Sequence, residues 1–196
     1  MNRKSIQMIQ HPELPADIRL GVTELPLPVG EKSRNRFRDV EKKTGRNLIK
    51  RIAEDEFQLS NIRLDYQENG KPVAICDQWS LHLSIAHSKS LVCGAVSQIR
   101  NVGVDIEQEN RNVVGQLPTR IRHPMENDAL YELPVLQIWT LKEAVLKWSG
   151  SGLRVAMRKI LIQSNNNSSF MAELSDGKKV KVCCFKKYSH WISVAF

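Results

Sequence analysis

The chain has 196 residues, 41% of them hydrophobic, with a formal net charge of +8 and an isoelectric point near 9.5. This length allows one ordinary domain or two small subdomains with a sizeable core. No segment has the run of about 20 apolar residues that a membrane-spanning helix needs, and the first residues lack a secretory signal, so we expect a soluble cytoplasmic protein. The positive charge predicts an acidic partner: nucleic acid, an anionic membrane, a phosphorylated ligand or an acidic protein.

The cysteines exclude the usual disulfide and zinc frameworks. No pair of the four cysteines has CxxC spacing (Cys76, Cys93, Cys183, Cys184). Two of them, Cys93 and Cys183, lie in strand-like apolar runs. We therefore expect buried free thiols rather than zinc ligands or disulfides.

The first third of the chain predicts an arm, a strand and a long basic helix. Residues 1–17 carry two prolines and no period, so we expect a loosely held arm, whereas residues 18–25 alternate like a strand. Residues 31–57 have helical spacing, with a predicted buried stripe of Phe37, Val40, Thr44, Leu48 and Ile52. Residues 31–51 contain nine basic and three acidic residues, a local net charge of +6.

Gly45 interrupts this helix at a cost of roughly 1 kcal/mol relative to alanine. Two explanations stay open: a packing notch against another element, or the close approach of a ligand beside Arg46. The sequence favours neither.

Short strands follow at residues 62–66, 81–87 and 91–97. A turn at residues 68–72 contains Asn69-Gly70, which supplies a positive φ, and Pro72, so it holds Lys71 on a stiff support. If these segments pair, Lys71 lies near His87 and the two form an anion site. A lone histidine at a strand end is more often a structural residue, and that alternative remains.

The second half predicts helices and then strands. We expect one helix to begin at Pro124 and another to run over residues 134–148, ended by Ser149-Gly150-Ser151-Gly152. Strands are expected at residues 159–163, 170–174, 180–185 and 191–196. The chain thus shows two rounds of helix followed by strands, which predicts an α+β fold of two like halves.

Two stretches carry the strongest chemical signal. In Gly103-Val104-Asp105-Ile106-Glu107, strand alternation puts both carboxylates on one face, and in residues 139–147 helical spacing puts Glu143 and Lys147 one turn apart. Three oxygen donors and a lysine suit magnesium that bridges a phosphate ester. The ordinary alternatives are a solvated strand end and a surface salt bridge. The apolar residues around both stretches favour a site, because carboxylates among core elements need partners.

Four segments in this order resemble the surfactin-synthetase-type 4′-phosphopantetheinyl transferases: Asn69-Gly70-Lys71-Pro72, His87-Ser88, Gly103-Val104-Asp105-Ile106-Glu107 and Trp139-Thr140-Leu141-Lys142-Glu143-Ala144-Val145-Leu146-Lys147. The resemblance extends from the basic helix to the C-terminus. It implies a pseudo-dimer of two α/β subdomains with the active site in the cleft between them. Residues 1–102 would bind the adenosine end of coenzyme A, and residues 103–196 would carry the metal and catalytic residues.

The activity that the resemblance implies is that of a holo-[acyl-carrier-protein] synthase type enzyme. It would move the 4′-phosphopantetheine arm of coenzyme A to a serine of an acyl or peptidyl carrier protein and release 3′,5′-adenosine bisphosphate. The carrier would belong to fatty acid, polyketide or non-ribosomal peptide synthesis. The resemblance also implies a cytoplasmic monomer with no nucleic-acid or membrane partner.

The resemblance assigns roles residue by residue. Asp105, Glu107 and Glu143 would hold magnesium, and Glu143 would accept the serine proton. Lys147 would neutralise the transferring phosphate, and Lys142 would support the pyrophosphate. Family positions that hold the adenosine 3′-phosphate match Arg46, Lys71 and His87.

Two segments depart from the family pattern. The family commonly reads F-N-x-S-H-S where this chain has L-S-I-A-H-S at residues 83–88. Arg120 and Glu126 keep their spacing, but aromatic positions between them are replaced by Ile121 and Arg122 in the region that faces the carrier. Carrier preference is therefore expected to differ.

Two other function classes remain as alternatives. A non-catalytic module that binds nucleic acid or an acidic protein through residues 31–51 would explain the charge, but it leaves the three acids unexplained and lacks a nucleic-acid motif. A different magnesium-dependent phosphotransferase that uses nucleotides is disfavoured, because the chain has no GxxxxGK[ST] phosphate loop.

Overall fold

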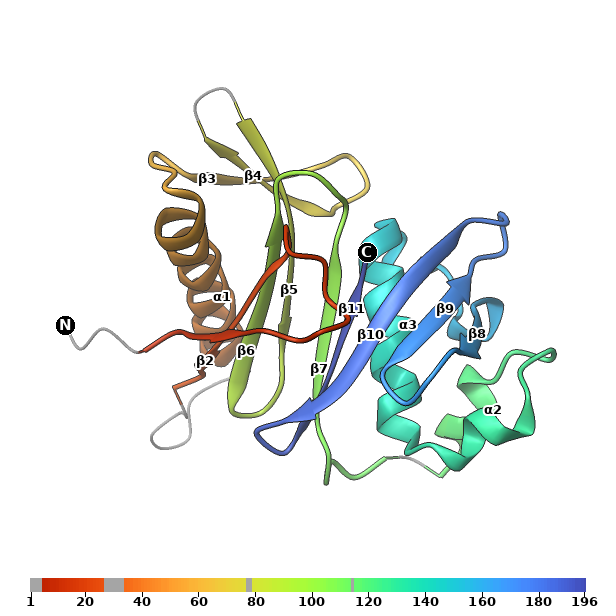
Figure 1. The fold of residues 1–196 in the computed structure, drawn as a ribbon. Coiled ribbons are helices and arrows are strands. Elements are labelled where there is room, and N and C mark those ends of the chain that lie inside the picture. Colours follow the sequence, from red (N-terminus) through yellow and green to blue (C-terminus); the bar gives the residue numbers. More distant parts are fainter. Residues whose placement is uncertain (1–4, 27–33, 77–78, 114) are drawn as a thin grey trace. The chain divides into compact units, whose positions relative to one another are not determined.

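The computed structural model describes residues 5–26, 34–76, 79–113 and 115–196. The chain divides into two compact units, Met1–Asn101 and Val102–Phe196. Each unit contains one antiparallel sheet and one long helix (Figure 1). This mixture of helices and antiparallel sheets agrees with the predicted α+β class.

The first unit is built on a six-stranded sheet with the strand order β1-β2-β6-β5-β4-β3. Its strands are β1 (Gln7–Ile9), β2 (Arg19–Glu24), β3 (Arg63–Tyr66), β4 (Pro72–Cys76), β5 (Trp79–His87) and β6 (Leu91–Ser97). The predicted loose arm is wrong in part, because β1 pairs with β2 and buries Ile9. The sequence also gave no sign of β4, which follows the Asn69-Gly70 turn directly.

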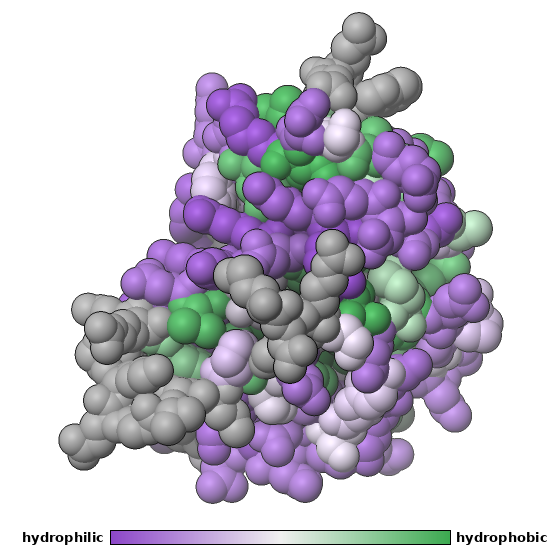
Figure 2. All heavy atoms as spheres, turned by 90° about the vertical axis from the view of Figure 1, so that its left-hand side faces the viewer, coloured by the Kyte–Doolittle hydropathy of each residue, from purple (hydrophilic) through white to green (hydrophobic). Residues whose placement is uncertain are grey.

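Helix α1 (Arg34–Phe57) packs on this sheet (Figure 1). Its buried stripe differs from the expected one. Leu48, Ile49, Ile52 and Ala53 are fully buried, whereas Val40, which the sequence placed in the stripe, is 36% exposed. The start of the expected helix, residues 31–33, lies outside the described residues. The face of the molecule that includes the outer side of α1 is mostly hydrophilic (Figure 2).

Packing explains Gly45. A Cβ atom at this position would lie 2.7 Å from Cγ2 of Ile85 on β5. The missing side chain therefore lets α1 approach the sheet closely, as the first of the two explanations predicted.

The second unit has a five-stranded sheet with the order β7-β11-β10-β9-β8. Its strands are β7 (Gly103–Gln108), β8 (Leu161–Ser164), β9 (Ser169–Glu173), β10 (Lys179–Lys187) and β11 (His190–Ala195). Helix α3 (Val135–Ser149) packs on the sheet, and α2 (Leu117–Ile121) and three 3₁₀ turns complete the unit: η1 (Asp128–Glu132), η2 (Gly152–Arg154) and η3 (Met157–Lys159).

The helix predicted to begin at Pro124 does not form. The backbone N–H of Glu126 bonds to the carbonyl of His123, which closes a turn, and the next helical element is the 3₁₀ turn η1. Asn127 caps η1 by accepting a hydrogen bond from the N–H of Ala129. By contrast, α3 ends where the sequence predicted, with Gly150 in a left-handed conformation at φ 70°.

Helix α3 lies against β7 with its backbone in direct contact. A Cβ atom on Gly103 would lie 2.1 Å from the carbonyl oxygen of Ala144 and 2.4 Å from the backbone nitrogen of Trp148. A second tie is the hydrogen bond that Ser193 on β11 donates to Thr140, with the hydroxyl oxygens 2.8 Å apart. These contacts fix the helix that carries Glu143 and Lys147 beside the strand that carries the acidic pair.

Two further expectations can be compared with the structure. All four cysteines are buried free thiols, as predicted. None of the helices within the described ranges is long and apolar enough to cross a membrane.

Candidate active site

The two carboxylates of β7 lie on the face of the sheet that α3 covers. Asp105 is opposite Ser193 in the β7–β11 register, and Glu107 is opposite Trp191. Since Ser193 bonds to α3, its face is the helix-covered one. Asp105 is only 7% exposed, so the predicted alternation places a charged group well inside the unit.

Helix α3 brings a lysine to this acidic pair. The ammonium nitrogen of Lys147 lies 2.8 Å from Oδ1 of Asp105. The other oxygen, Oδ2, is buried and has no hydrogen-bond partner among the described residues. Two stretches that are some forty residues apart in sequence therefore meet, and one carboxylate oxygen is left with unused capacity to bind a cation or a donor.

Asp105 raises the pKa of each of the other two acids. Burial raises the pKa of Glu107 to about 7, and the charge of Asp105 adds to this effect, while Arg111 and Lys147 oppose it. The pKa of Glu143 is also raised, first by burial and then by Asp105, with Lys147 acting in the opposite direction. Burial and the charge of Asp105 thus both favour the protonated form of Glu143, which suits a group that accepts a proton.

The carboxylates of Asp105, Glu107 and Glu143 are of the chemical type that binds magnesium. Carboxylate oxygens are its usual protein ligands, and Asp105 has an unpartnered buried oxygen. Within the described part of the chain, no three Asp, Glu, His or Cys side chains are grouped so as to hold a metal ion. Two of the acids instead form ion pairs with basic side chains: Asp105 with Lys147, and Glu107 with Arg111.

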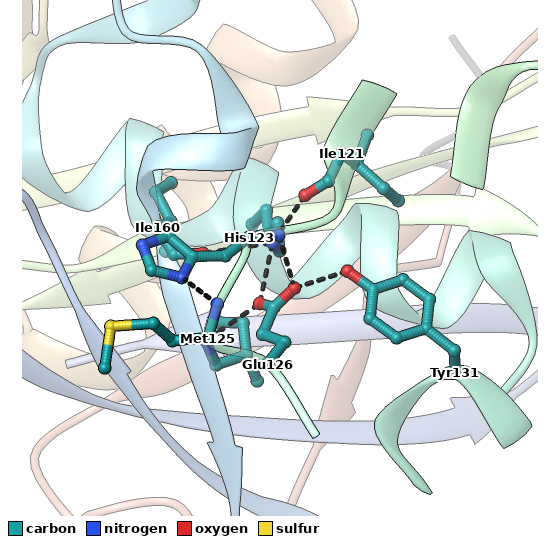
Figure 3. A network of polar contacts seen from close by, with 8 residues as sticks. Ile121, His123, Met125, Glu126, Tyr131 and Ile160 are labelled. Carbon is teal, nitrogen blue, oxygen red and sulfur yellow. Dashed lines mark hydrogen bonds and ion pairs between the residues drawn. The ribbon is translucent and has the colours of Figure 1, made fainter. Parts of the chain in front are cut away.

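The structure separates Lys142 from the other predicted site residues. Its side chain is 0% exposed, and its ammonium nitrogen lies 2.7 Å from Oε1 of Glu126. It also donates to the carbonyl oxygens of Ile121 and Ile160, at 2.6 and 3.0 Å (Figure 3). The three donors of the Lys142 ammonium group are thus all used inside the unit, which leaves none for a pyrophosphate in this geometry.

Glu126 is the centre of this buried network. Its two carboxylate oxygens accept hydrogen bonds from the backbone N–H groups of Ile162, at 2.9 Å, and His123, at 2.8 Å, and from the hydroxyl of Tyr131 (Figure 3). The network joins α3, η1, β8 and the segment that follows α2. Sequence reasoning noted the spacing of Glu126 but missed its partner, because nothing in the sequence shows which lysine faces it.

The three predicted adenosine-binding residues lie in the first unit, each with its own neighbour. Arg46 is exposed, with a guanidinium nitrogen 3.4 Å from the hydroxyl of Tyr66. His87 is 3.2 Å from a carboxylate oxygen of Glu41.

Lys71 is 7% exposed and donates to the side chain of Asn101, and burial lowers its pKa to about 8. Segments β4 and β5 do pair, with Val73 opposite His82. The positive charge of Lys71 adds to burial in lowering the pKa of His82. Lys71 contacts Asn101 and His87 lies beside Glu41, and an anion site formed by Lys71 and His87 stays a prediction.

Arg111 is the residue at this site that the sequence did not reveal. It contacts Glu107, and its guanidinium carbon lies 5.7 Å from the ring centre of Trp139 on α3. It stands in a polar loop after β7 and outside every recognised motif, so only the fold of that loop brings it to the site.

Comparison with known proteins supports the resemblance. The family model described as the 4′-phosphopantetheinyl transferase superfamily matches residues 101–195. A 122-residue segment, 56% of this chain, is 29% identical to the 4′-phosphopantetheinyl transferase HetI of Nostoc sp. (strain PCC 7120) and covers 51% of that protein. The chain thus spans about half the length of this curated relative. Both similarities agree with the resemblance, and the family-model match lies on the unit that holds Asp105, Glu107, Glu143 and Lys147.

Proposed function

We propose that the protein transfers the 4′-phosphopantetheine arm of coenzyme A to a serine of an acyl or peptidyl carrier protein and releases 3′,5′-adenosine bisphosphate. The superfamily match and the similarity to HetI support this activity. The observation that carries it is the contact of Lys147 with Asp105, because it joins the two motif stretches into one acidic and basic site.

We propose that Asp105, Glu107 and Glu143 hold magnesium, which would neutralise the pyrophosphate of coenzyme A and orient it for attack. Glu143 is the proton acceptor for the carrier serine, directly or through a water. Its pKa is raised by burial and by Asp105, which suits a group that takes up the serine proton. The serine oxygen forms the new bond to phosphorus as the pyrophosphate bridge bond breaks.

Lys147 supports the same step from one helical turn further along α3. Its side chain is 29% exposed, so the ammonium group can bond to a bound phosphate while it remains next to Asp105. A cation in this position stabilises the negative charge that develops on the transferring phosphate. Lys142 contributes indirectly, because its buried network braces the segments around α3.

The remaining roles concern the first unit and the partners. We propose that Arg46, Lys71 and His87 bind the adenosine end of coenzyme A, with the 3′-phosphate as their target. Lys71 is buried, so its ammonium group is held in place, whereas Arg46 is exposed, so its guanidinium group can move to fit the phosphate. We also propose a cytoplasmic monomer of the surfactin-synthetase type, a pseudo-dimer of two similar halves.

Substitution of the acids tests the proposal. Glu143→Gln and Asp105→Asn each remove a charged oxygen with little change of volume, so we expect a loss of transfer rate of about a hundredfold or more with native circular dichroism. Glu132→Gln, an exposed residue of η1, is the control and should keep the wild-type rate. Wild-type rates in either site variant would refute the assigned roles.

A further inference from the structure

Arg111 lies in the loop after β7 and contacts one side chain of β7, Glu107, and one of α3, Trp139. A guanidinium N–H of Arg111 contacts Oε1 of Glu107, four residues earlier in the chain. The backbone N–H of Arg111 donates to the carbonyl of Gln108 at 3.0 Å, which closes the turn that directs its side chain back toward β7. The guanidinium also lies against the ring of Trp139 in the first part of α3.

Two of the three carboxylates therefore have a cationic side chain beside them. The Glu107 side chain is 13% exposed, so its charge is poorly screened by water. A divalent cation that binds this carboxylate must overcome the repulsion of Arg111 and displace it from Oε1. Because the Arg111 side chain is 43% exposed, it has room to move while the Trp139 ring still supports its flat face.

We propose that Arg111 is a counter-ion of Glu107 that competes with the divalent cation and is released to an anionic group of the substrate when the cation binds. This inference rests on the proposed function. Arg111 is expected to weaken binding of the cation alone. A polyphosphate should tighten cation binding, because its oxygens accept hydrogen bonds from the guanidinium group once that group has left Glu107. Arg111 would thus couple metal entry to coenzyme A entry.

Manganese binding to the full-length protein tests this directly, since free Mn²⁺ is counted by its electron paramagnetic resonance signal. Arg111→Gln should bind Mn²⁺ on the order of tenfold more tightly, the factor expected when one unit charge about 6 Å from a divalent cation is removed in water. Addition of coenzyme A should tighten Mn²⁺ binding strongly in the wild type and much less in this variant. Arg111→Lys keeps the charge and should stay within about twofold of the wild type.

Arg122→Gln is the matched control. Arg122 also contacts a carboxylate, that of Asp128, and stacks on an aromatic ring, that of Tyr131, in the same unit. It should leave Mn²⁺ affinity unchanged. An unchanged or weaker affinity in Arg111→Gln, or an equal gain in Arg122→Gln, would overturn the inference alone. Absence of Mn²⁺ binding in every protein would overturn both the inference and the metal site of the proposed function.

Discussion

At the scale of single residues, Glu107 links the site to the stability of the fold. Its pKa is raised from 4.5 to about 7, mainly by burial and further by Asp105. Between these two values the folded protein binds more protons at this position than the unfolded chain does. The free energy of unfolding is therefore expected to fall as the pH rises through this window, and Glu143 acts in the same direction.

Glu107→Gln removes the titrating group and should reduce this fall. The measurement is urea denaturation at pH 5 and pH 7.5 for the wild type, Glu107→Gln and the exposed control Glu132→Gln. The control should follow the wild type. If all three proteins show the same pH dependence, the raised pKa of Glu107 is wrong.

Lys142 gives a second prediction at this scale. Lys142→Met leaves the Glu126 carboxylate buried without its cation, which should lower the free energy of unfolding by about 3–5 kcal/mol. The double variant Lys142→Met/Glu126→Leu should recover part of this loss. Lys159→Met, at an exposed position, should change stability by no more than about 0.5 kcal/mol. A stable Lys142→Met protein with weakened coenzyme A binding would instead restore the pyrophosphate role.

Helical spacing placed Lys147 one turn from Glu143, but the sequence did not show that Lys142 is buried and bound to Glu126. Most positions of α3 are buried, on several sides of the helix (Leu136, Ile138, Leu141, Ala144, Val145, Leu146). When a helix is apolar on nearly all sides, the sequence pattern does not show which side faces the sheet. The difference between Lys142 and Lys147 is therefore set by tertiary packing, in particular by the position of Glu126.

At the scale of elements, Gly103 controls how closely α3 approaches β7. The Cβ atom of an alanine there would meet backbone atoms of Ala144 and Trp148, which cannot move without shifting the helix. Gly103→Ala should therefore cost about 3 kcal/mol of stability, and it should also lower transfer activity because Glu143 and Lys147 move away from Asp105.

Gly94→Ala on β6 is the matched comparison. The atoms nearest to its added Cβ atom belong to the side chains of Ile49 and Leu48, which have more freedom to adjust than backbone atoms. We expect a clearly smaller loss of unfolding free energy, measured by thermal or urea denaturation. Equal costs for the two substitutions would show that the backbone contact of α3 does not limit the site.

Most elements were predictable because their periods were clear and their ends carried strong breakers. The helix ended by Gly150 and the four strands of the last forty residues are examples. Strands β1 and β4 were missed because each is short and its pairing depends on a neighbour. The helix expected at Pro124 failed because Glu126, which would have belonged to its first turns, is instead drawn into the buried network with Lys142.

At the scale of the whole molecule, the net charge of +8 must be explained by its partners. Many of the basic residues of α1 are exposed (Arg38, Lys42, Lys43, Arg46, Lys50). A nucleic-acid module would use them for salt-dependent binding to phosphates. Under the proposed function they serve coenzyme A and the carrier instead.

Fluorescence anisotropy with a labelled DNA duplex and a labelled single-stranded RNA separates these readings. We expect no binding at about 150 mM salt, since the described elements contain no recognised nucleic-acid motif. Tight binding that weakens by orders of magnitude between about 50 and 200 mM salt would favour the basic-module alternative.

The central claim is that this protein modifies carrier proteins covalently. The most direct measurement is to incubate it with coenzyme A, magnesium and a panel of apo acyl and peptidyl carrier proteins, and to weigh the carriers by intact-protein mass spectrometry. We predict that at least one carrier gains about 340 Da, the mass of the phosphopantetheine group that coenzyme A carries. No mass gain in any carrier, together with no binding of coenzyme A, would contradict the account.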